Sequence, residues 1–161
     1  MSGSGVATFE RLYDEHGTPL YQYLLGQVRR VDTAEDLLQT VMLRVVKYRR
    51  KLRDVANPRA WLFTIARNEL RRHLARQARH EQGELPLLVA PEDSFDEDLE
   101  ALRAALGRLA PERWEVISLK VYQQLTFAEI GEVLAISPNT AASRYRYALD
   151  DLRRMLEGRH E

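Results

Sequence analysis

Hydrophobic residues recur at helical spacing along most of the chain, with charged and polar residues between them. The spacing predicts helices at about 6–30, 32–48 and 58–79, a fourth that ends near residue 109, and a fifth that starts at residue 111. Within the first helix, the segment 17–19 (Gly-Thr-Pro) should bend the helix or split it. Because helical periodicities are long and turn signals are few, the pattern predicts an all-α protein.

The stretch 125–156 predicts a short helix, a tight turn and a longer helix. Thr126 and Glu129 have the spacing of a capping box, so the short helix should begin there. Ser137 can accept the unpaired amide hydrogens at the start of the longer helix, and Pro138 suits its first position. The turn between them is then the pair at 135–136.

The longer helix has one apolar face and one polar, basic face. The apolar face carries Ala141, Tyr145, Ala148, Leu152 and Leu156. The opposite face carries Asn139, Ser143 and Arg146, flanked by Thr140 and Tyr147 on one side and Ala142 on the other. A helix of this kind fits a DNA major groove, and its side chains can donate to phosphates and base edges. The pattern favours a DNA-binding helix-turn-helix over a helical hairpin whose outer face is only solvated.

Two positions depart from the usual helix-turn-helix pattern. Gly131 and Ala135 stand where such motifs more often carry alanine and glycine. Gly131 should cost the short helix about 1 kcal/mol of propensity.

The predicted helix at 58–79 carries a second polar and basic face. Its inward stripe is Trp61, Leu62, Ile65, Ala66, Leu70 and Leu74. On another face Thr64, Asn68, Arg72 and Arg76 follow each other every four residues, flanked by Arg67 and Arg71. Arginines suit phosphates, whereas Asn and Thr can both donate and accept, so the mixture indicates nucleic-acid contact.

Charge is distributed unevenly, although the formal net charge of the 161 residues is zero. Residues 31–80 carry 12 Lys/Arg against 5 Asp/Glu, residues 81–100 carry 8 acids and no Lys/Arg, and residues 101–161 carry 9 against 8. Within the first of these segments, five of the seven residues at 47–53 are basic. We therefore predict two small helical domains joined by an acidic linker, with a polyanionic partner for the first.

Several classes of site have no support in the sequence. There are no cysteines, and the four histidines are scattered without metal-ligand spacing. No glycine-rich phosphate-binding loop or nucleophile elbow is present, so we expect no catalytic residues, no metal site and no cofactor. No apolar run reaches membrane-spanning length and no secretion signal is evident, which makes a cytoplasmic location the expectation.

With these features, the chain resembles a known family, the extracytoplasmic-function (ECF) group of bacterial RNA polymerase sigma factors of the sigma-70 family. The matching stretches in the first half are DTAEDLLQTVMLRVVKYRRKL and NPRAWLFTIARNELRRHL. In the second half the match is LRAALGRLAPERWEVISLKVYQQLTFAEIGEVLAISPNTAASRYRYALDDLR. Both halves match in order and spacing over about residues 8–157, which is more specific than a helix-turn-helix alone.

The resemblance implies a division of roles along the chain. Residues 6–80 would be sigma region 2, which recognises and melts the promoter minus-ten element and binds the clamp of core RNA polymerase. Residues 81–95 would be an acidic linker, and residues 96–158 would be region 4, which reads the minus-thirty-five element. Asp36 and Gln39 match positions that contact polymerase, and the loop at 52–59 matches one that helps to hold an extruded base.

The resemblance also implies DNA contacts at particular residues. On the minus-ten side these are Thr64, Arg67, Asn68, Arg71 and Arg72. In the recognition helix we expect Ser143 and Arg146 to contact bases, together with Asn139 and Tyr147, and Thr140 and Arg144 to contact phosphates. Many family members carry arginine where this chain has Ala142 and Tyr147, so the usual promoter sequence of the family is not transferred.

The implied partners are core RNA polymerase, promoter DNA and an anti-sigma factor, without membrane insertion. Two other functions stay open at this stage. One is a stand-alone DNA-binding regulator that uses only the helix-turn-helix, although it leaves the basic helix at 58–79 without a role. The other is a helical adaptor or inhibitor that binds polymerase but does not start transcription.

Overall fold

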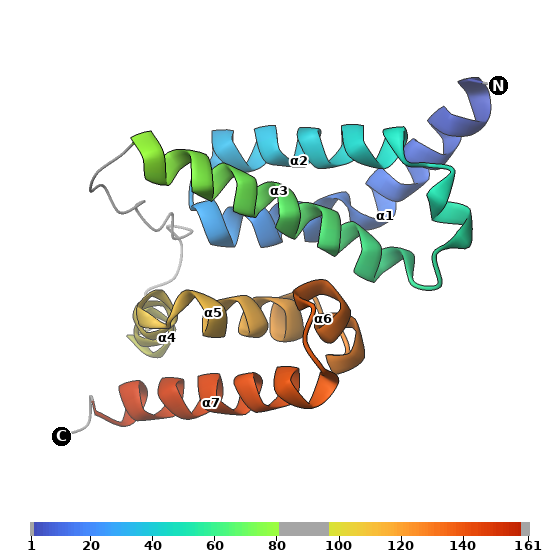
Figure 1. The fold of residues 1–161 in the computed structure, drawn as a ribbon. Helices are drawn as coiled ribbons and strands as arrows, with labels where there is room; N and C mark the ends of the chain where they lie inside the picture. Colours follow the sequence, from blue (N-terminus) through green and yellow to red (C-terminus); the bar gives the residue numbers. More distant parts are fainter. Residues whose placement is uncertain (1, 81–96, 159–161) are drawn as a thin grey trace. The chain divides into compact units, whose positions relative to one another are not determined.

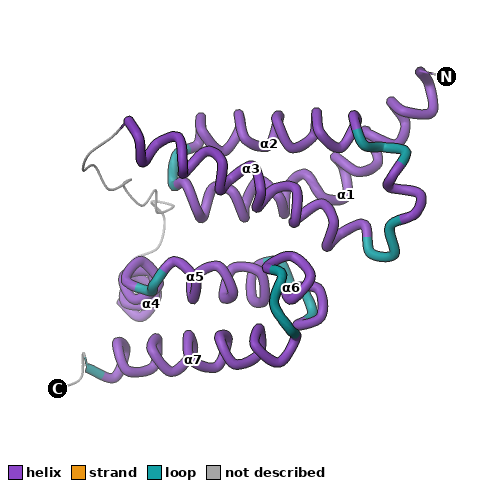
Figure 2. Tube along the Cα trace, in the orientation of Figure 1, coloured by secondary structure: helices purple, strands orange, loops and turns teal. Residues whose placement is uncertain are grey.

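A computed structural model describes residues 2–80 and 97–158, all of them in helices or short connections (Figures 1 and 2). No strand occurs in these two ranges, so the prediction of an all-α protein is confirmed. The chain divides into two compact units, Met1–Leu87 and Leu88–Glu161. The predicted acidic linker at 81–95 lies outside the described residues. Within the described residues, no helix is long and apolar enough to cross a lipid bilayer.

Over residues 2–80, the first unit consists of three long helices and one 3₁₀ turn. These elements are α1 (Ser2–Val28), α2 (Val31–Lys47), η1 (Lys51–Asp54) and α3 (Pro58–His80). Each of the three long helices packs against the other two (Figure 1). The centre of the unit is fully buried and includes Tyr23 and Phe63, whose rings meet edge to face with centroids 5.7 Å apart.

Helix α1 is continuous through Pro19, so the alternative in which the proline splits it is wrong. A proline inside a helix removes a hydrogen bond and costs about 3 kcal/mol. The residues that follow it compensate, because Leu20, Tyr23 and Leu24 are completely buried. Burial of a large side chain contributes about 1.5–3 kcal/mol, so three of them outweigh the proline.

The sequence offers Thr33 and Asp36 as caps for the start of the second helix, and the structure differs from this prediction. Helix α2 has no side-chain cap, and the amide of Thr33 donates to the Asp32 carboxylate at 2.9 Å. Helix α3 begins at Pro58 as predicted, and the side chain of Asn57 accepts a hydrogen bond from the Ala60 amide at 3.1 Å. Leu74, which we predicted on the inward stripe of this helix, is instead 43% exposed.

The second unit is built around its last helix. Its elements are α4 (Glu97–Arg108), α5 (Pro111–Ile117), a π-helical turn η2 (Ser118–Tyr122), α6 (Phe127–Leu134) and α7 (Pro138–Glu157). Helix α7 packs against α4, α5 and α6 (Figure 1). A buried cluster of Ala105, Leu109, Ile117, Ala148 and Leu152 joins α7 to α4 and α5.

The predicted caps of the helix-turn-helix segment are confirmed. The Thr126 hydroxyl accepts from the Glu129 amide at 3.1 Å, while the Thr126 amide donates to the Glu129 carboxylate at 2.9 Å. Ser137 accepts from the Thr140 amide at 3.1 Å, and Pro138 occupies the first turn of α7. Local sequence therefore determines where both helices begin.

The turn between α6 and α7 explains the two unusual residues in it. A Cβ atom on Gly131 would lie 2.6 Å from the carbonyl oxygen of Ile136, so only glycine permits this close approach. Ala135 ends α6 in the left-handed region, with φ 57° and ψ 44°. The glycine is thus needed at Gly131 for space, and alanine bears the strain of a position where glycine would be relaxed.

Ala135→Gly should raise the free energy of unfolding of the second unit by about 1 kcal/mol. The left-handed conformation costs an L-residue about 1–2 kcal/mol, part of which the extra unfolded-state entropy of glycine cancels. The measurement is urea unfolding of the full chain in a Trp61→Phe background, where Trp114 fluorescence reports the second unit. Ala142→Gly, inside α7, is the matched control and should lower stability by about 1 kcal/mol. An Ala135→Gly protein no more stable than the parent contradicts the strain argument.

Candidate nucleic-acid interfaces

The face of α3 that we predicted to contact DNA is largely exposed. Asn68, Arg71 and Arg72 are exposed, whereas Thr64 and Arg67 are half-buried. The Thr64 hydroxyl donates to the Ala60 carbonyl oxygen at 2.8 Å, so its hydrogen is used within the helix. Three of the five predicted contact residues on α3 are therefore exposed to a partner.

A buried carboxylate, Glu69, lies beside this face. Its side chain is only 4% exposed, and it forms ion pairs with Arg44 of α2 and with Arg72 one turn further along α3. The Arg72 guanidinium donates to Glu69 Oε1 at 2.8 Å. A buried charge is tolerated only when it is paired, and two arginines provide the pairing here. Glu69 therefore links α2 to α3 through Arg44 and orients Arg72, one of the side chains predicted to contact DNA.

Sequence reasoning missed Glu69, although one signal was present. It is the sole acid in the segment 58–80, and it continues the apolar spacing of Leu62 and Ala66. Nothing in the sequence around Arg44, 25 positions earlier in the chain, indicates that it pairs with Glu69, because the pairing depends on how α2 packs against α3.

The basic segment between α2 and α3 surrounds one aromatic ring. The ammonium groups of Lys47 and Lys51 lie 5.5 and 5.2 Å from the centroid of the Tyr48 ring. Arg49, Arg50 and Arg53 are exposed in the same segment. Its concentrated positive charge can attract a phosphate backbone.

The recognition face of α7 is exposed and partly pre-ordered. Asn139, Thr140, Arg146 and Tyr147 are exposed, and Ser143 and Arg144 are half-buried. Arg146 donates to the Ser143 hydroxyl at 3.3 Å, so the two residues predicted to read bases are in contact. The Ser137 hydroxyl donates to the Thr140 hydroxyl oxygen at 2.9 Å, which leaves the Thr140 hydrogen directed elsewhere.

Two further residues adjoin this face, and sequence reasoning missed both. Arg113, in the first turn of α5, lies 5.8 Å from the centroid of the Tyr147 ring and forms an ion pair with Asp151 of α7. The hydrogen bond from Arg113 lowers the pKa of the Asp151 carboxyl, and Arg154 acts in the same direction. Arg113 and Asp151 are 38 positions apart, so periodicity within either helix cannot reveal the pair.

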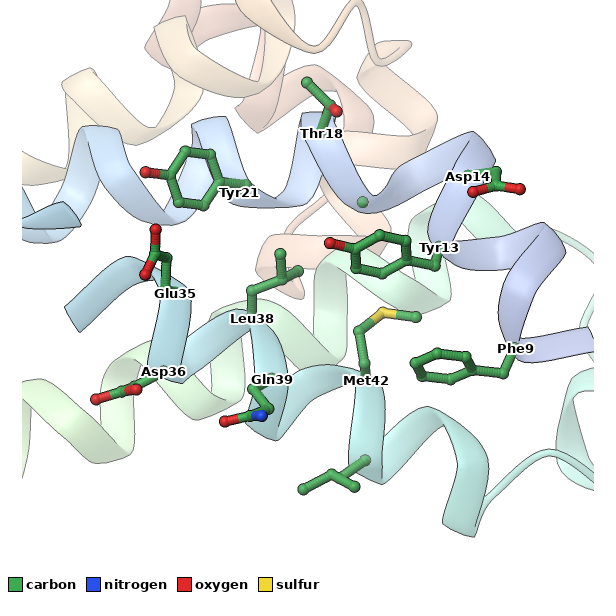
Figure 3. Close-up of a pocket in the computed structure, with 12 residues that line it drawn as sticks. Phe9, Tyr13, Asp14, Thr18, Tyr21, Glu35, Asp36, Leu38, Gln39 and Met42 are labelled. Atoms are coloured by element: carbon green, nitrogen blue, oxygen red, sulfur yellow. The ribbon is translucent and has the colours of Figure 1, made fainter. Parts of the chain in front are cut away.

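A groove between α1 and α2 contains the two residues predicted to bind polymerase. It has a volume of about 960 Å³, and Figure 3 shows Asp36 and Gln39 at its α2 side. Its other lining is mixed: Phe9, Tyr13, Asp14, Gly17, Thr18, Tyr21, Glu35, Leu38, Met42 and Leu43. Tyr13 and Leu43 are 49% and 66% exposed and contribute apolar surface to the groove. Apolar surface next to three carboxylates suits a protein partner with apolar and basic side chains.

Comparisons with known proteins agree along nearly the whole chain. Two family models match, Sigma-70 region 2 over residues 12–80 and Sigma-70, region 4 over residues 105–154. The chain is similar to the ECF RNA polymerase sigma factor SigL of Mycobacterium tuberculosis, with 34% identity covering 94% of this chain and 90% of SigL. RNA polymerase sigma factor CarQ of Myxococcus xanthus is 33% identical, over 92% of this chain and 88% of CarQ.

Two solved structures share the fold. The sigma factor RpoE of Bartonella quintana, in complex with the anti-sigma factor NepR, has a TM-score of 0.80 and 22% identity, covering 93% of this chain and 97% of RpoE. CnrH, in complex with the cytosolic domain of CnrY, has a TM-score of 0.66 and 25% identity, covering 93% of this chain and 88% of CnrH.

Glu69→Gln should lower the free energy of unfolding of the first unit by about 1–3 kcal/mol. Glutamine keeps the volume, but it leaves Arg44 and Arg72 without the negative charge between them. The measurement is urea unfolding of the full chain in a Trp114→Phe background, where Trp61 reports the first unit. The same substitution at the exposed Glu15, whose carboxylate lies 3.6 Å from the half-buried His16, is the control and should change stability by less than about 0.5 kcal/mol. Equal effects of the two substitutions contradict the role of Glu69.

Proposed function

Because the chain belongs to the ECF group of the sigma-70 family, and is a sigma factor that directs promoter-specific transcription initiation, we propose a division of that function between its two units. Residues 6–80 recognise and melt the minus-ten element and bind the polymerase clamp. Residues 96–158 recognise the minus-thirty-five element, and residues 81–95 connect them. The observation that carries this proposal is that each family match falls within one compact unit and each unit has an exposed basic helical face.

The surface of α2 beside the groove is the proposed contact with core RNA polymerase. Asp36 and Gln39 are exposed there, so both can meet a partner without rearrangement. The nearby carboxylates favour a basic partner surface, and the exposed side chains of Tyr13 and Leu43 add apolar area.

The polar, partly exposed face of α3 is the proposed contact with the minus-ten element. Its members are Thr64, Arg67, Asn68, Arg71 and Arg72. Strand separation has a cost of a few kcal/mol per extruded base, and a basic wall that captures single-stranded DNA offsets part of that cost. Glu69 supports this role because it holds Arg72 in place before DNA arrives.

The outer face of α7 is the proposed reader of the minus-thirty-five element. Ser143 and Arg146 contact bases, with Asn139 and Tyr147 beside them, and Thr140 and Arg144 contact phosphates. The hydroxyl of Thr140 supports the phosphate role, because its oxygen already accepts from Ser137 and its hydrogen is left to donate.

The proposed partners are core polymerase, promoter DNA and an anti-sigma factor, and the proposed place of action is the cytoplasm. We propose an anti-sigma partner because RpoE, which shares the fold, was solved in complex with the anti-sigma factor NepR, and such a partner would cover the same exposed faces. Neither unit needs to bind DNA tightly by itself, because the polymerase tethers both and raises their effective concentration. The stand-alone regulator is not favoured, since the family match includes the first unit.

Start-site mapping tests whether the protein directs initiation and whether α7 recognises the minus-thirty-five element. Purified core polymerase with this protein should produce RNA starts preceded by two spaced elements, absent without it. Ser143→Ala and Arg146→Ala should change the preferred upstream element in a promoter-library selection, each losing about 1–3 kcal/mol of discrimination. Arg153→Ala, 68% exposed at the other end of α7, is the control and should leave the preference unchanged. Unchanged preference in all three variants contradicts the assignment of α7.

Asn68→Ala and Arg72→Ala should impair promoter opening more than docking on duplex DNA. Their side chains are proposed to capture the separated strand, which exists only after melting. The expected loss is about tenfold in the opening rate, at nearly constant affinity for the closed promoter. Permanganate footprinting measures opening, and gel-shift titration of the holoenzyme measures docking. Arg11→Ala, an exposed arginine of α1, controls for loss of one charge. Equal losses in both steps argue against this role.

A further inference from the structure

The polar surface of the recognition helix continues onto α5. Tyr147 is 59% exposed, and the guanidinium of Arg113 lies over its ring, 5.8 Å from the centroid. Arg113 comes from the first turn of α5, more than 30 residues earlier in the chain. An exposed aromatic side chain usually moves freely, whereas the Tyr147 ring has a cation within cation–π distance.

Asp151 explains why Arg113 occupies this position. It lies one helical turn beyond Tyr147 on α7, and its carboxylate is only 18% exposed. Arg113 donates to its Oδ2 atom, and Arg154 donates to its Oδ1 atom. The hydrogen bond from Arg113 lowers the pKa of this carboxyl.

The group has a surplus of positive charge and of hydrogen-bond donors. Two arginines share one carboxylate, which leaves one net positive charge beside the Tyr147 ring. A guanidinium has five N–H donors, and Asp151 engages only part of those on Arg113. The Arg113 side chain is 37% exposed, so the remaining donors can reach a ligand.

We propose that Arg113 and Tyr147 form one composite DNA contact at the edge of the recognition surface, with Asp151 as the residue that positions it. Arg113 binds a backbone phosphate of the upstream element. Its guanidinium plane holds the Tyr147 ring in one orientation, in which the phenol faces the neighbouring base edge. This inference rests on the proposed role of α7, and it adds a specificity-determining residue that lies outside the helix-turn-helix.

Two measurements on the holoenzyme test separately whether Arg113 binds a phosphate and whether it positions Tyr147. The first is affinity for upstream-element duplex DNA as a function of salt. Arg113→Ala should weaken binding and reduce the slope of log K against log salt by about 1, because one phosphate contact is lost. Arg103→Ala, which removes an arginine of α4 paired with Glu100, is the matched control and should leave the slope unchanged.

The second measurement is promoter-library selection with variants of the pair. Arg113→Ala and Tyr147→Ala should relax preference at the same base pairs, and the double variant should match the more severe single variant. Arg113→Lys should keep the salt slope but relax the preference, because an ammonium retains the charge and lacks the stacking plane. Arg113→Lys also retains a partner for Asp151, so the test survives if the alanine variant unfolds.

The outcomes separate this inference from the proposed function. If Ser143→Ala and Arg146→Ala shift the upstream preference while Arg113→Ala and Arg113→Lys do not, the composite contact is wrong and the role of α7 stands. Additive effects of Arg113→Ala and Tyr147→Ala at different base pairs overturn the shared contact. If Ser143→Ala and Arg146→Ala also have no effect, the role of α7 itself fails, and the composite contact fails with it.

Discussion

The first unit depends on packing a strongly basic helix, α3, into an apolar core. One stripe of α3 is completely buried against α1 and α2, and Phe63 meets Tyr23 at its centre. The rest of its surface is largely polar and charged, so the helix would not be stable without that stripe. The one acid in α3 is buried as well, and it draws Arg44 and Arg72 toward the boundary between the stripe and the basic face. Packing and the proposed DNA contact therefore share the same few residues.

Pre-ordering of charged side chains is common to both units. Glu69 holds Arg72 in the first unit, and Asp151 holds Arg113 in the second. An arginine that is already oriented loses less conformational entropy on binding than a free one. Each carboxylate also lowers the local positive charge, which weakens attraction to DNA of any sequence. For a sigma factor this balance is useful, because polymerase provides the tether and the protein has to provide selectivity.

The turn of the helix-turn-helix shows how local strain is distributed. Gly131 allows the Ile136 carbonyl to approach α6, and Ala135 accepts a left-handed backbone next to it. Both residues depart from the usual helix-turn-helix pattern. In the structure both residues belong to the same turn. The close approach at Gly131 excludes any residue with a Cβ atom, whereas the left-handed backbone at Ala135 still accepts alanine. Capping bonds at Thr126 and Ser137 define the starts of the two helices on either side of this turn.

The sequence by itself determined the features that depend on residues close together in the chain. Helical spacing predicted the all-α fold, the capping residues predicted where α6 and α7 begin, and motif order predicted the family that the comparisons then showed. The predicted contact residues on α3 and α7 stay predictions, although the structure shows most of them exposed. Tertiary structure alone decided the continuity of α1 through Pro19 and the exposure of Leu74. It also decided the groove beside Asp36 and the partners of Glu69 and Arg113. The physical reason is that periodicity describes one helix at a time, whereas these features arise where side chains of different helices meet.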